Sequence, residues 1–533
     1  MSALADRPKP SPAPSTPTAA PGDLVVATTS GRIRGTRTSR AQIFYDVPYA
    51  APPVEEARFA APRPHPGWAG VRDAGRPGPT APQPPRGRFG RLDLSPFFGG
   101  GWERGEDYLT VNVWAPPEPS TPAPVLVFVH GGAFIAGSTR GPVYDGTAFA
   151  RDGVVLVTVN YRLGIPGFLR LPDAPDNRGR LDVIAALRWI SANAPLFGGD
   201  PGNVTLAGQS AGAIIVTSIA GAPDAQGLFR RVIIQSGSGT AAFTHEQAVI
   251  VTAAVGREIG GAPTAAALGQ RSDEELVDVL PRLSGLDLAT ADAHDPLGGI
   301  TPFSLVLDRQ PADTVADLAA RADADRGAPA TELLIGSNLD EGSLYLAPFQ
   351  DLDDSTETDL RSTAARFHPA PDRLVDAYRS AQPSATTAQL RVALLGDGMF
   401  GAGTRRFADA HAQAGAARTF VYEFTWRSEA LDGKLGSCHL MELPFVFDKA
   451  GLPALHGPGA LLGTQPPPRD LAARVHATWV RFATHGDPGW PAYSQVTPTV
   501  QQIGETWTQV VGPHAEEFRA WGLSASRPPA PSR

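Results

Sequence analysis

The sequence predicts an α/β fold in which a large, mostly parallel, twisted sheet is flanked by helices. Residues 125–129 and 154–159 are valine-rich and apolar throughout, as expected for central strands that are covered on both faces. Strand patterns then alternate with helical patterns along the chain, which favours parallel strands joined by helical crossovers. A small N-terminal antiparallel sheet and helical cap insertions complete the predicted architecture.

The individual elements follow from local patterns. Short β-type runs separated by turns over residues 23–58 predict the antiparallel sheet. The helix predicted over 181–193 places Val183, Leu187 and Ile190 on one side. An Ala-, Asp- and Leu-rich region over 241–327 predicts helices that cap the carboxyl edge of the sheet. The remaining predicted elements are strands at 109–114, 204–207, 231–235, 332–335 and 419–425, and a small-residue helix at 211–220.

The domain organisation is expected to be simple. The chain of 533 residues is long enough for a large buried core, and it shows no internal repeat and no linker that would divide it. We predict a disordered Pro/Ala/Ser-rich tail over 1–22, a single catalytic domain over 23–523 and a flexible tail over 524–533.

Composition restricts the class of partner. Lysine and arginine number 46 against 54 acidic residues, a net charge of −8 that lacks the basic surplus of a nucleic-acid-binding protein. Apolar runs are strand-sized, so no membrane span is expected. The first 22 residues lack a signal-peptide pattern, and the single cysteine, Cys438, cannot form an intramolecular disulfide. We therefore expect a cytoplasmic protein, with its oligomeric state undetermined.

A candidate nucleophile lies in the segment Gly208-Gln209-Ser210-Ala211-Gly212, between a predicted strand and a predicted helix. This is the setting of a nucleophile elbow, a sharp turn that exposes the serine at the amino end of a helix. Glycines flank the serine because such a turn leaves no room for side chains two positions away. The helix terminus favours developing negative charge. Ser210 is thus the predicted nucleophile.

A second motif, His130-Gly131-Gly132-Ala133-Phe134, directly follows the strand predicted at 125–129. Small residues allow backbone N–H groups to approach a substrate carbonyl. The N–H groups of Gly132, Ala133 and Ala211 are therefore predicted to form a three-donor oxyanion hole. His130 is interpreted as structural.

The chain resembles the carboxylesterase type B family, the cholinesterase-like branch of the α/β-hydrolases. The resemblance implies the α/β-hydrolase fold, hydrolysis of a small-molecule carboxylic ester, and no need for a metal or organic cofactor. It extends beyond the two motifs, from Gly31 to about Tyr493. Its segments include 47–50, 58–59, 106–109, 160–164, 197–201, 235–238 and 442–447.

The remaining catalytic residues are placed partly by chain order, which in this fold runs serine, acid, histidine. His439 follows the strand predicted at 419–425 and lies just before residues 442–445, which is where the family keeps its catalytic histidine; His485 is its main rival. Asp340 or Glu341, after the strand at 332–335, supplies the acid, and the resemblance favours Glu341. The acid would hold the imidazole in the required tautomer.

Some assignments depart from the family or stay open. Gln209 replaces a frequent glutamate of the elbow, and Cys438 beside His439 has no second ligand cluster that would indicate a metal site. Alternative functions are a serine enzyme that transfers the acyl group or processes a carbamate or lactone, and a non-catalytic binding protein on the same fold. The residues proposed to line a substrate pocket are Phe134, Phe303, Tyr345 and Phe400.

Overall fold

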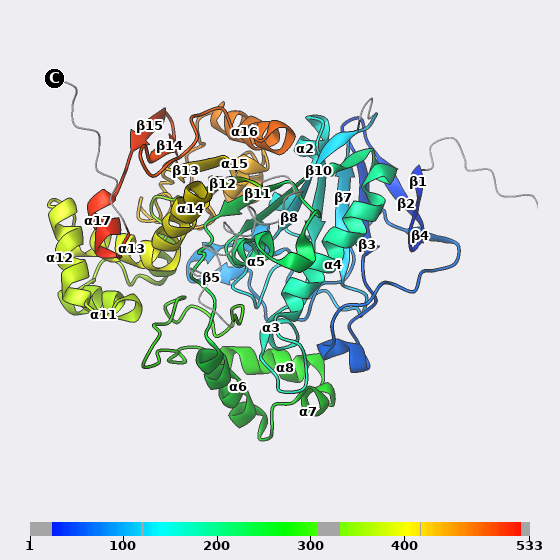
Figure 1. The fold of residues 1–533 in the computed structure, drawn as a ribbon, viewed down its shortest axis with the longest axis horizontal. Coiled ribbons are helices and arrows are strands. Elements are labelled where there is room, and N and C mark those ends of the chain that lie inside the picture. Colours follow the sequence, from blue (N-terminus) through cyan, green and yellow to red (C-terminus); the bar gives the residue numbers. More distant parts are fainter. Residues whose placement is uncertain (1–23, 119–121, 308–330, 416, 524–533) are drawn as a thin grey trace, which may run out of the picture.

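The computed structural model describes residues 24–118, 122–307, 331–415 and 417–523, so the tails predicted over 1–22 and 524–533 lie outside it. One 13-stranded sheet runs through the molecule, and a two-stranded sheet is formed by β5 and β6 (Figure 1). The strands are β1 (Leu24–Thr28), β2 (Gly31–Arg37), β3 (Gln42–Pro48), β4 (Val71–Asp73), β5 (Arg88–Phe89), β6 (Leu92–Asp93), β7 (Thr110–Ala115), β8 (Ala123–Val129), β9 (Val155–Val159), β10 (Gly199–Gln209), β11 (Arg231–Gln235), β12 (Glu332–Asn338), β13 (Thr419–Phe424), β14 (Thr499–Ile503) and β15 (Trp507–Val511).

The strand order of the large sheet is β1-β2-β3-β7-β9-β8-β10-β11-β12-β13-β14-β15, with β4 paired to β2. Neighbouring strands are parallel from β9 through β14, and β14 pairs antiparallel with β15. The predicted α/β class with a mostly parallel sheet is confirmed. The N-terminal strands β1 to β3 are antiparallel as predicted, but β3 also pairs with β7. They therefore continue the main sheet instead of forming a separate one.

Helices and helical turns connect the strands and cover the sheet. The helices are α1 (Ser95–Phe98), α2 (Thr147–Arg151), α3 (Gly164–Phe168), α4 (Arg178–Asn193), α5 (Ala211–Ala220), α6 (His245–Ile259), α7 (Ala265–Gly269), α8 (Asp273–Val279), α10 (Ser343–Leu346), α11 (Glu357–Phe367), α12 (Pro371–Ala381), α13 (Thr387–Gly396), α14 (Ala402–Ala414), α15 (Leu443–Val446), α16 (Leu471–His485) and α17 (Ala515–Ala520). The shorter turns are η1 (Glu55–Phe59), η2 (Pro142–Tyr144), η3 (Ala194–Phe197), η4 (Pro223–Ala225), η5 (Leu280–Leu283), η6 (Ala347–Phe349), the π-helical η7 (Asp397–Gly401) and η8 (Pro453–Leu455).

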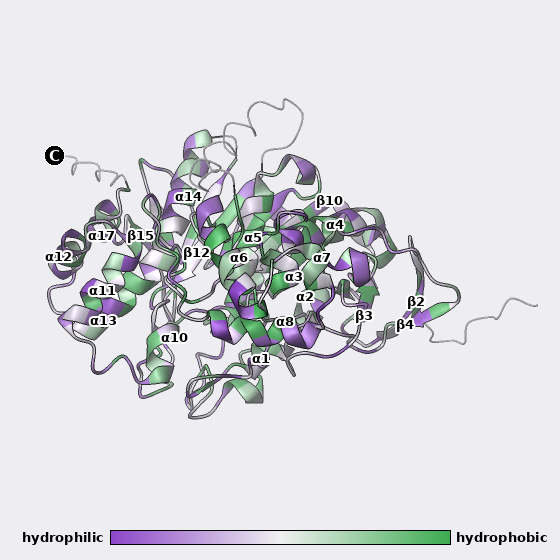
Figure 2. Ribbon diagram, turned by 90° about the horizontal axis from the view of Figure 1, so that it is seen from below, coloured by the Kyte–Doolittle hydropathy of each residue, from purple (hydrophilic) through white to green (hydrophobic). Residues whose placement is uncertain are grey.

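The hydrophobic core lies on both faces of the sheet. Successive side chains of a strand point to opposite faces, and β8 shows the result: Val125 and Val127 belong to one buried cluster, whereas Leu126 and Phe128 belong to another. Figure 2 shows hydrophobic residues gathered at the centre of the molecule, with hydrophilic ones on its outer helices. The uniformly apolar strands of the sequence are thus the ones covered on both sides.

Two groups of helices extend from the sheet (Figure 1). Helices α6, α7 and α8 form one group, within the region predicted as a cap, of which residues 308–327 lie outside the described chain. Helices α11 to α13 form the other group together with α17, around a separate cluster that includes Leu374 and Tyr378. Within the described ranges, none of the helices has the length and apolarity to span a bilayer.

Candidate active site

Ser210 lies on the sharp turn between β10 and α5. Its backbone has φ 56° and ψ −126°, a conformation that a residue with a side chain rarely adopts. The flanking glycines are required by close contacts. A Cβ on Gly208 would lie 2.6 Å from the Gly212 carbonyl carbon, and one on Gly212 would lie 2.1 Å from the Val129 oxygen. The elbow predicted from the five-residue motif is therefore present, with Ser210 at the amino end of α5.

The loop that follows β8 passes directly beside the elbow. A Cβ built on Gly131 would lie 2.9 Å from Ser210 Cβ, so only a glycine allows this approach. Gly132 and Ala133 have positive φ angles of 123° and 56°. The N–H groups of Gly132, Ala133 and Ala211 donate no hydrogen bond to another described residue. Three free amide donors thus lie in two segments that meet at Ser210, as an oxyanion hole requires.

Polar contacts hold this loop in place. The hydroxyl of Thr301 donates to the Ala133 carbonyl at 2.8 Å. The Gly137 N–H donates to the Gln83 side-chain oxygen at 2.8 Å, and the Gln83 amide donates back to the Gly137 carbonyl at 3.0 Å. The strained loop is thereby attached to two other parts of the chain.

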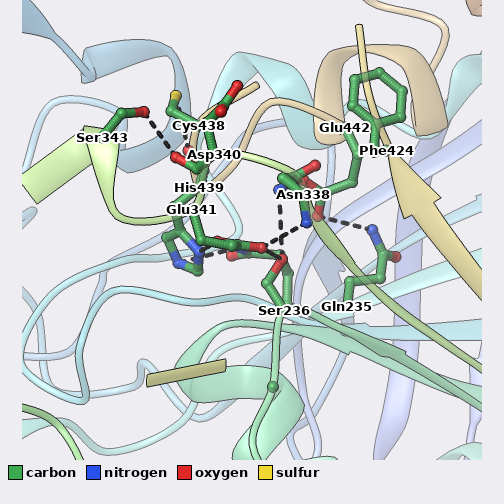
Figure 3. Close-up of polar contacts among 12 residues, drawn as sticks. Gln235, Ser236, Asn338, Asp340, Glu341, Ser343, Phe424, Cys438, His439 and Glu442 are labelled. Atoms are coloured by element: carbon green, nitrogen blue, oxygen red, sulfur yellow. Dashed lines mark hydrogen bonds and ion pairs between the residues drawn. The ribbon is translucent and has the colours of Figure 1, made fainter. Parts of the chain in front are cut away.

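His439 and Glu341 form a buried pair (Figure 3), with His439 Nδ1 2.5 Å from Glu341 Oε2. Because an ionised carboxylate only accepts hydrogen bonds, Nδ1 carries the proton and Nε2 is left as the acceptor of the neutral ring. The other oxygen of Glu341 accepts from the Ser236 hydroxyl at 2.5 Å and from the Asn338 N–H at 2.7 Å. Three donors therefore fix the carboxylate that orients His439.

The rivals of these two residues lie elsewhere. Asp340, the neighbour of Glu341, accepts hydrogen bonds from the Ser437 N–H at 2.8 Å and from the Arg427 side chain. His485 is exposed at the end of α16, where it lines a surface depression together with Asp152 and Arg481. The structure thus pairs His439 with Glu341 and leaves Asp340 and His485 outside this arrangement.

A second buried carboxyl group, that of Glu442, lies next to the pair. Burial, followed by the charge of Glu341, raises the pKa of Glu442 to about 7. The side-chain amides of Asn338 and Gln235 donate to its two oxygens at 2.7 and 3.2 Å (Figure 3). The site thus contains two neighbouring carboxyl groups, of which Glu442 gives up its proton at an unusually high pH.

Gln209 contacts the remaining nitrogen of His439. Its side-chain nitrogen lies 3.3 Å from His439 Nε2, and its own oxygen is buried without a hydrogen-bond donor among the described residues. The Ser210 hydroxyl forms no hydrogen bond within the same part of the chain. In this structure, then, the acceptor nitrogen of the imidazole faces the amide of Gln209, the residue immediately before Ser210.

The four proposed pocket residues fall into two groups. Phe400 and Tyr345 lie beside the imidazole of His439, with ring centroids 4.4 and 5.8 Å from it, respectively, and 6.5 Å from each other. Phe134 instead packs edge-on against Phe168, and Phe303 is buried in the same hydrophobic cluster as Phe134. The structure therefore places Tyr345 and Phe400 next to His439. Phe134 lies next to Ala133 in the sequence, and Phe303 lies two residues after Thr301.

Two other residues singled out in the sequence have structural surroundings. Burial lowers the pKa of His130 to about 4, and its neutral ring stacks on Tyr161 with centroids 4.6 Å apart. Burial likewise raises the pKa of the Cys438 thiol well above its usual value, so a reactive thiolate is disfavoured. Among the residues that the structure describes, no group of three or more His, Cys, Asp and Glu side chains is arranged to hold a metal ion.

The sequence did not identify several polar residues of the site. Ser236, Asn338 and Glu442 surround the Glu341 carboxylate, and Gln209 contacts His439, although Gln209 was noted only for its lost charge. Ser236 directly follows β11, Asn338 is the last residue of β12, and Glu442 lies three residues after the candidate histidine. These positions were the available signal. A polar residue at the carboxyl end of a central strand is a candidate for such a role.

Known proteins of similar sequence and structure are carboxylesterases and related hydrolases. The sequence profile of the carboxylesterase family matches residues 22–521. The chain is 34% identical to phenmedipham hydrolase from Pseudarthrobacter oxydans, covering 91% of this chain and 96% of that protein. It is also 34% identical to para-nitrobenzyl esterase from Bacillus subtilis, covering 89% and 93% of the two chains. The crystal structure of carboxylesterase EST55 from Geobacillus stearothermophilus superimposes with a TM-score of 0.78 at 32% identity, covering 93% of this chain and 99% of that one.

Proposed function

Because this chain belongs to the carboxylesterase family and is a carboxylic ester hydrolase, we propose that it works through a Ser210–His439–Glu341 triad and an acyl-enzyme intermediate. The observation that carries the proposal is the Glu341 carboxylate, which accepts from His439 at 2.5 Å beside the Ser210 elbow. The proposed substrate is a small-molecule ester, and none of the proposed steps uses a metal or organic cofactor.

Nucleophilic attack requires a base near Ser210. The neutral His439 ring has its lone pair on Nε2, on the side of Gln209 and hence of the elbow. As the hydroxyl of Ser210 attacks the ester carbonyl, Nε2 takes its proton, and the resulting imidazolium is stabilised by Glu341. The hydroxyl must replace the Gln209 amide as the partner of Nε2. Such tightening on substrate binding is common, because catalytic hydrogen bonds are often long in free enzymes.

The carbonyl oxygen becomes negatively charged during the attack. The free N–H groups of Gly132, Ala133 and Ala211 are proposed to accept this charge. His439 then returns the proton to the departing alcohol, which leaves the acyl group on Ser210. Water, activated by the same histidine, releases the acid and restores the enzyme.

The final acceptor distinguishes the main alternative. An enzyme with the same triad could transfer its acyl group to an amine or an alcohol, or act on a carbamate or lactone. Hydrolysis remains the proposal because the relatives are described as a hydrolase and an esterase. The second alternative, a binding protein on this fold, is disfavoured because the chain has Ser210 on its elbow together with the buried His439–Glu341 pair.

A panel of p-nitrophenyl esters tests the proposal. We expect hydrolysis by the wild type, and a loss of kcat of at least about a thousandfold in Ser210→Ala and His439→Ala. A fluorophosphonate probe should label the wild type at Ser210 and leave Ser210→Ala unlabelled. Ser218→Ala, which alters a serine further along α5, is the matched control and should retain activity and labelling.

Two outcomes would contradict the proposal. Wild-type rates in Ser210→Ala would exclude this serine as the nucleophile. An absence of both ester hydrolysis and probe labelling in the folded wild type would favour the binding-protein alternative.

A further inference from the structure

The segment 83–91 contacts both the oxyanion loop and α10, the helix that follows the proposed catalytic acid. At its start, Gln83 forms two hydrogen bonds with Gly137. Further on, the Phe89 ring packs edge-on against Tyr345 with centroids 6.2 Å apart, and the Arg91 N–H donates to the Pro348 carbonyl at 3.0 Å. The segment 83–91 therefore spans the distance between the two walls of the candidate active site.

Arg86 lies in the middle of this segment and has no anionic partner in the part of the chain that the structure describes. Among the residues that the structure describes, it forms no ion pair and donates no hydrogen bond. Its side chain is nevertheless partly buried, and this burial lowers its pKa. Nearby arginines behave differently: Arg91 donates to the Ala347 carbonyl and Arg140 to the Gly78 carbonyl at 2.8 Å.

An unpaired, partly buried guanidinium costs free energy, because it loses hydration without gaining another partner. Such a cost is commonly retained where a ligand supplies the missing partner. The charge is also close to the reacting groups. The guanidinium of Arg86 interacts electrostatically with the phenol of Tyr345. The ring of Tyr345 lies 5.8 Å from the His439 imidazole.

The chemistry of this position selects one kind of ligand. A guanidinium presents a planar fork of N–H donors that matches the two oxygens of a carboxylate. The partial burial of Arg86 strengthens such a pairing, because water competes less for the charge. A single arginine matches one negative charge. The Glu341 carboxylate is already satisfied by three donors, and no ion pair joins it to Arg86 among the described residues.

We propose that Arg86 binds a carboxylate carried by the substrate, so that the enzyme prefers esters whose acyl or alcohol part bears a carboxylate. This inference rests on the proposed function, since it names the substrate class of the same site. Arg86 acts as a specificity-determining residue, separate from the triad. It lowers the free energy of the transition state for anionic esters and leaves that for neutral esters nearly unchanged.

Two matched pairs of substrates test the proposal. On the acyl side, mono-p-nitrophenyl adipate is compared with the analogue in which an acetyl group replaces the carboxylate. On the alcohol side, meta-carboxyphenyl acetate is compared with meta-acetylphenyl acetate. The quantity measured is the ratio of kcat/KM for the anionic ester to that for its neutral partner. Comparing this ratio between variants cancels the intrinsic reactivity of each ester.

In Arg86→Gln we expect the ratio to fall about ten- to hundredfold for at least one pair, as the loss of a charge-assisted hydrogen bond implies. The kcat/KM of the neutral ester should change less than about threefold. Arg86→Lys should keep part of the preference. Arg88→Gln is the matched control, because Arg88 lies two residues away with an exposed side chain, and its ratios should equal those of the wild type. Adipate should also inhibit the wild type more strongly than Arg86→Gln.

The outcomes separate this inference from the proposed function. Unchanged ratios for both pairs in folded Arg86→Gln, or an equal loss on anionic and neutral esters, would overturn the role of Arg86 while leaving the esterase proposal intact. Failure of the wild type to hydrolyse even the neutral esters would instead contradict the proposed function itself.

Discussion

The ring of Phe400 lies face to face with the imidazole of His439, with centroids 4.4 Å apart and planes 12° from parallel. Phe400 belongs to η7, a π-helical turn, and such turns occur often at functional sites. Asp397 of the same turn accepts a hydrogen bond from the Tyr378 phenol, which accepts in turn from the Trp521 indole at 2.8 Å. The turn that presents Phe400 is thus fastened to α12 and to the residue after α17.

Replacing Phe400 by leucine should reduce the rate of the chemical step. The stacked ring restrains the imidazole of His439, and such aromatic pairs contribute about 0.5–1.5 kcal/mol. Without it, the imidazole can rotate out of the orientation in which Nε2 accepts the proton. We expect kcat on p-nitrophenyl acetate to fall about two- to tenfold with KM little changed. Tyr345→Phe, which keeps its ring beside the histidine, is the control. Equal kcat values for Phe400→Leu and wild type would show that the stacking has no catalytic role.

Replacing Gln209 by glutamate should change the pH dependence of the reaction. The substitution places a carboxylate where the amide now lies 3.3 Å from His439 Nε2. A negative charge there favours the protonated imidazole, which cannot act as a base. The acid limb of the kcat/KM profile should therefore move to higher pH than in the wild type. Gln209→Met, which introduces no charge, should leave the position of that limb unchanged; a shift in both variants would contradict the electrostatic explanation.

Glu442 should make the stability of the protein depend on pH. Its pKa is raised from an ordinary value of 4.5 to about 7, so the folded state holds a proton that the unfolded state releases. The resulting stabilisation is fully present below pH 4.5 and is lost as the pH rises through 7. Between pH 5 and 8 the free energy of unfolding should fall by roughly 1–3 kcal/mol more in the wild type than in Glu442→Gln. Denaturant titrations of both proteins at pH 5 and pH 8 measure this difference. An equal change in the free energy of unfolding for wild type and variant would count against it.

His514 should stabilise the C-terminal part of the fold at neutral pH. Burial alone lowers its pKa, but the hydrogen bond and charge of Glu423, 2.8 Å away, raise it to about 9. A histidine whose pKa is raised in the folded state stabilises that state fully when the pH is below 6.5, the pKa in the unfolded state. This stabilisation disappears as the pH rises through 9.

His514→Gln should therefore lower the free energy of unfolding by about 1–3 kcal/mol at pH 6 and have little effect at pH 10. Thermal unfolding of wild type and variant at the two pH values gives the comparison. His485→Gln, at an exposed histidine, is the control and should differ from wild type at neither pH. A loss of stability that is the same at pH 6 and pH 10 would indicate a packing effect without a contribution from charge.

Local patterns predicted the parts of the fold and site that depend on neighbouring residues. The elbow around Ser210 and the apolar strands β8 and β9 were visible because glycine spacing and uniform hydrophobicity are local signals. The hairpin of β14 and β15 was not predicted. Its strands carry alternating polar residues, such as Gln501 and Thr508, that resemble a loop.

Contacts between distant residues could not be predicted in this way. Gln209 and His439 are separated by 230 positions, and Gln235 and Glu442 by 207. Their approach depends on strand order and register, which composition and periodicity do not specify. Among the described residues, the lack of a partner for Arg86 is likewise a property of its whole surroundings, since Arg91 of the same segment does have one.

The register between β11 and β12 has a consequence for where the proposed catalytic acid lies. Gln235 is paired with Gly336, so Ser236 and Asn338 extend from neighbouring strand ends and meet at Glu341. Helices α6 to α8 are inserted in the chain between these two strands. The position of Glu341 therefore depends on this strand pairing, whereas the inserted segment contacts the site through Thr301 and the Ala133 carbonyl.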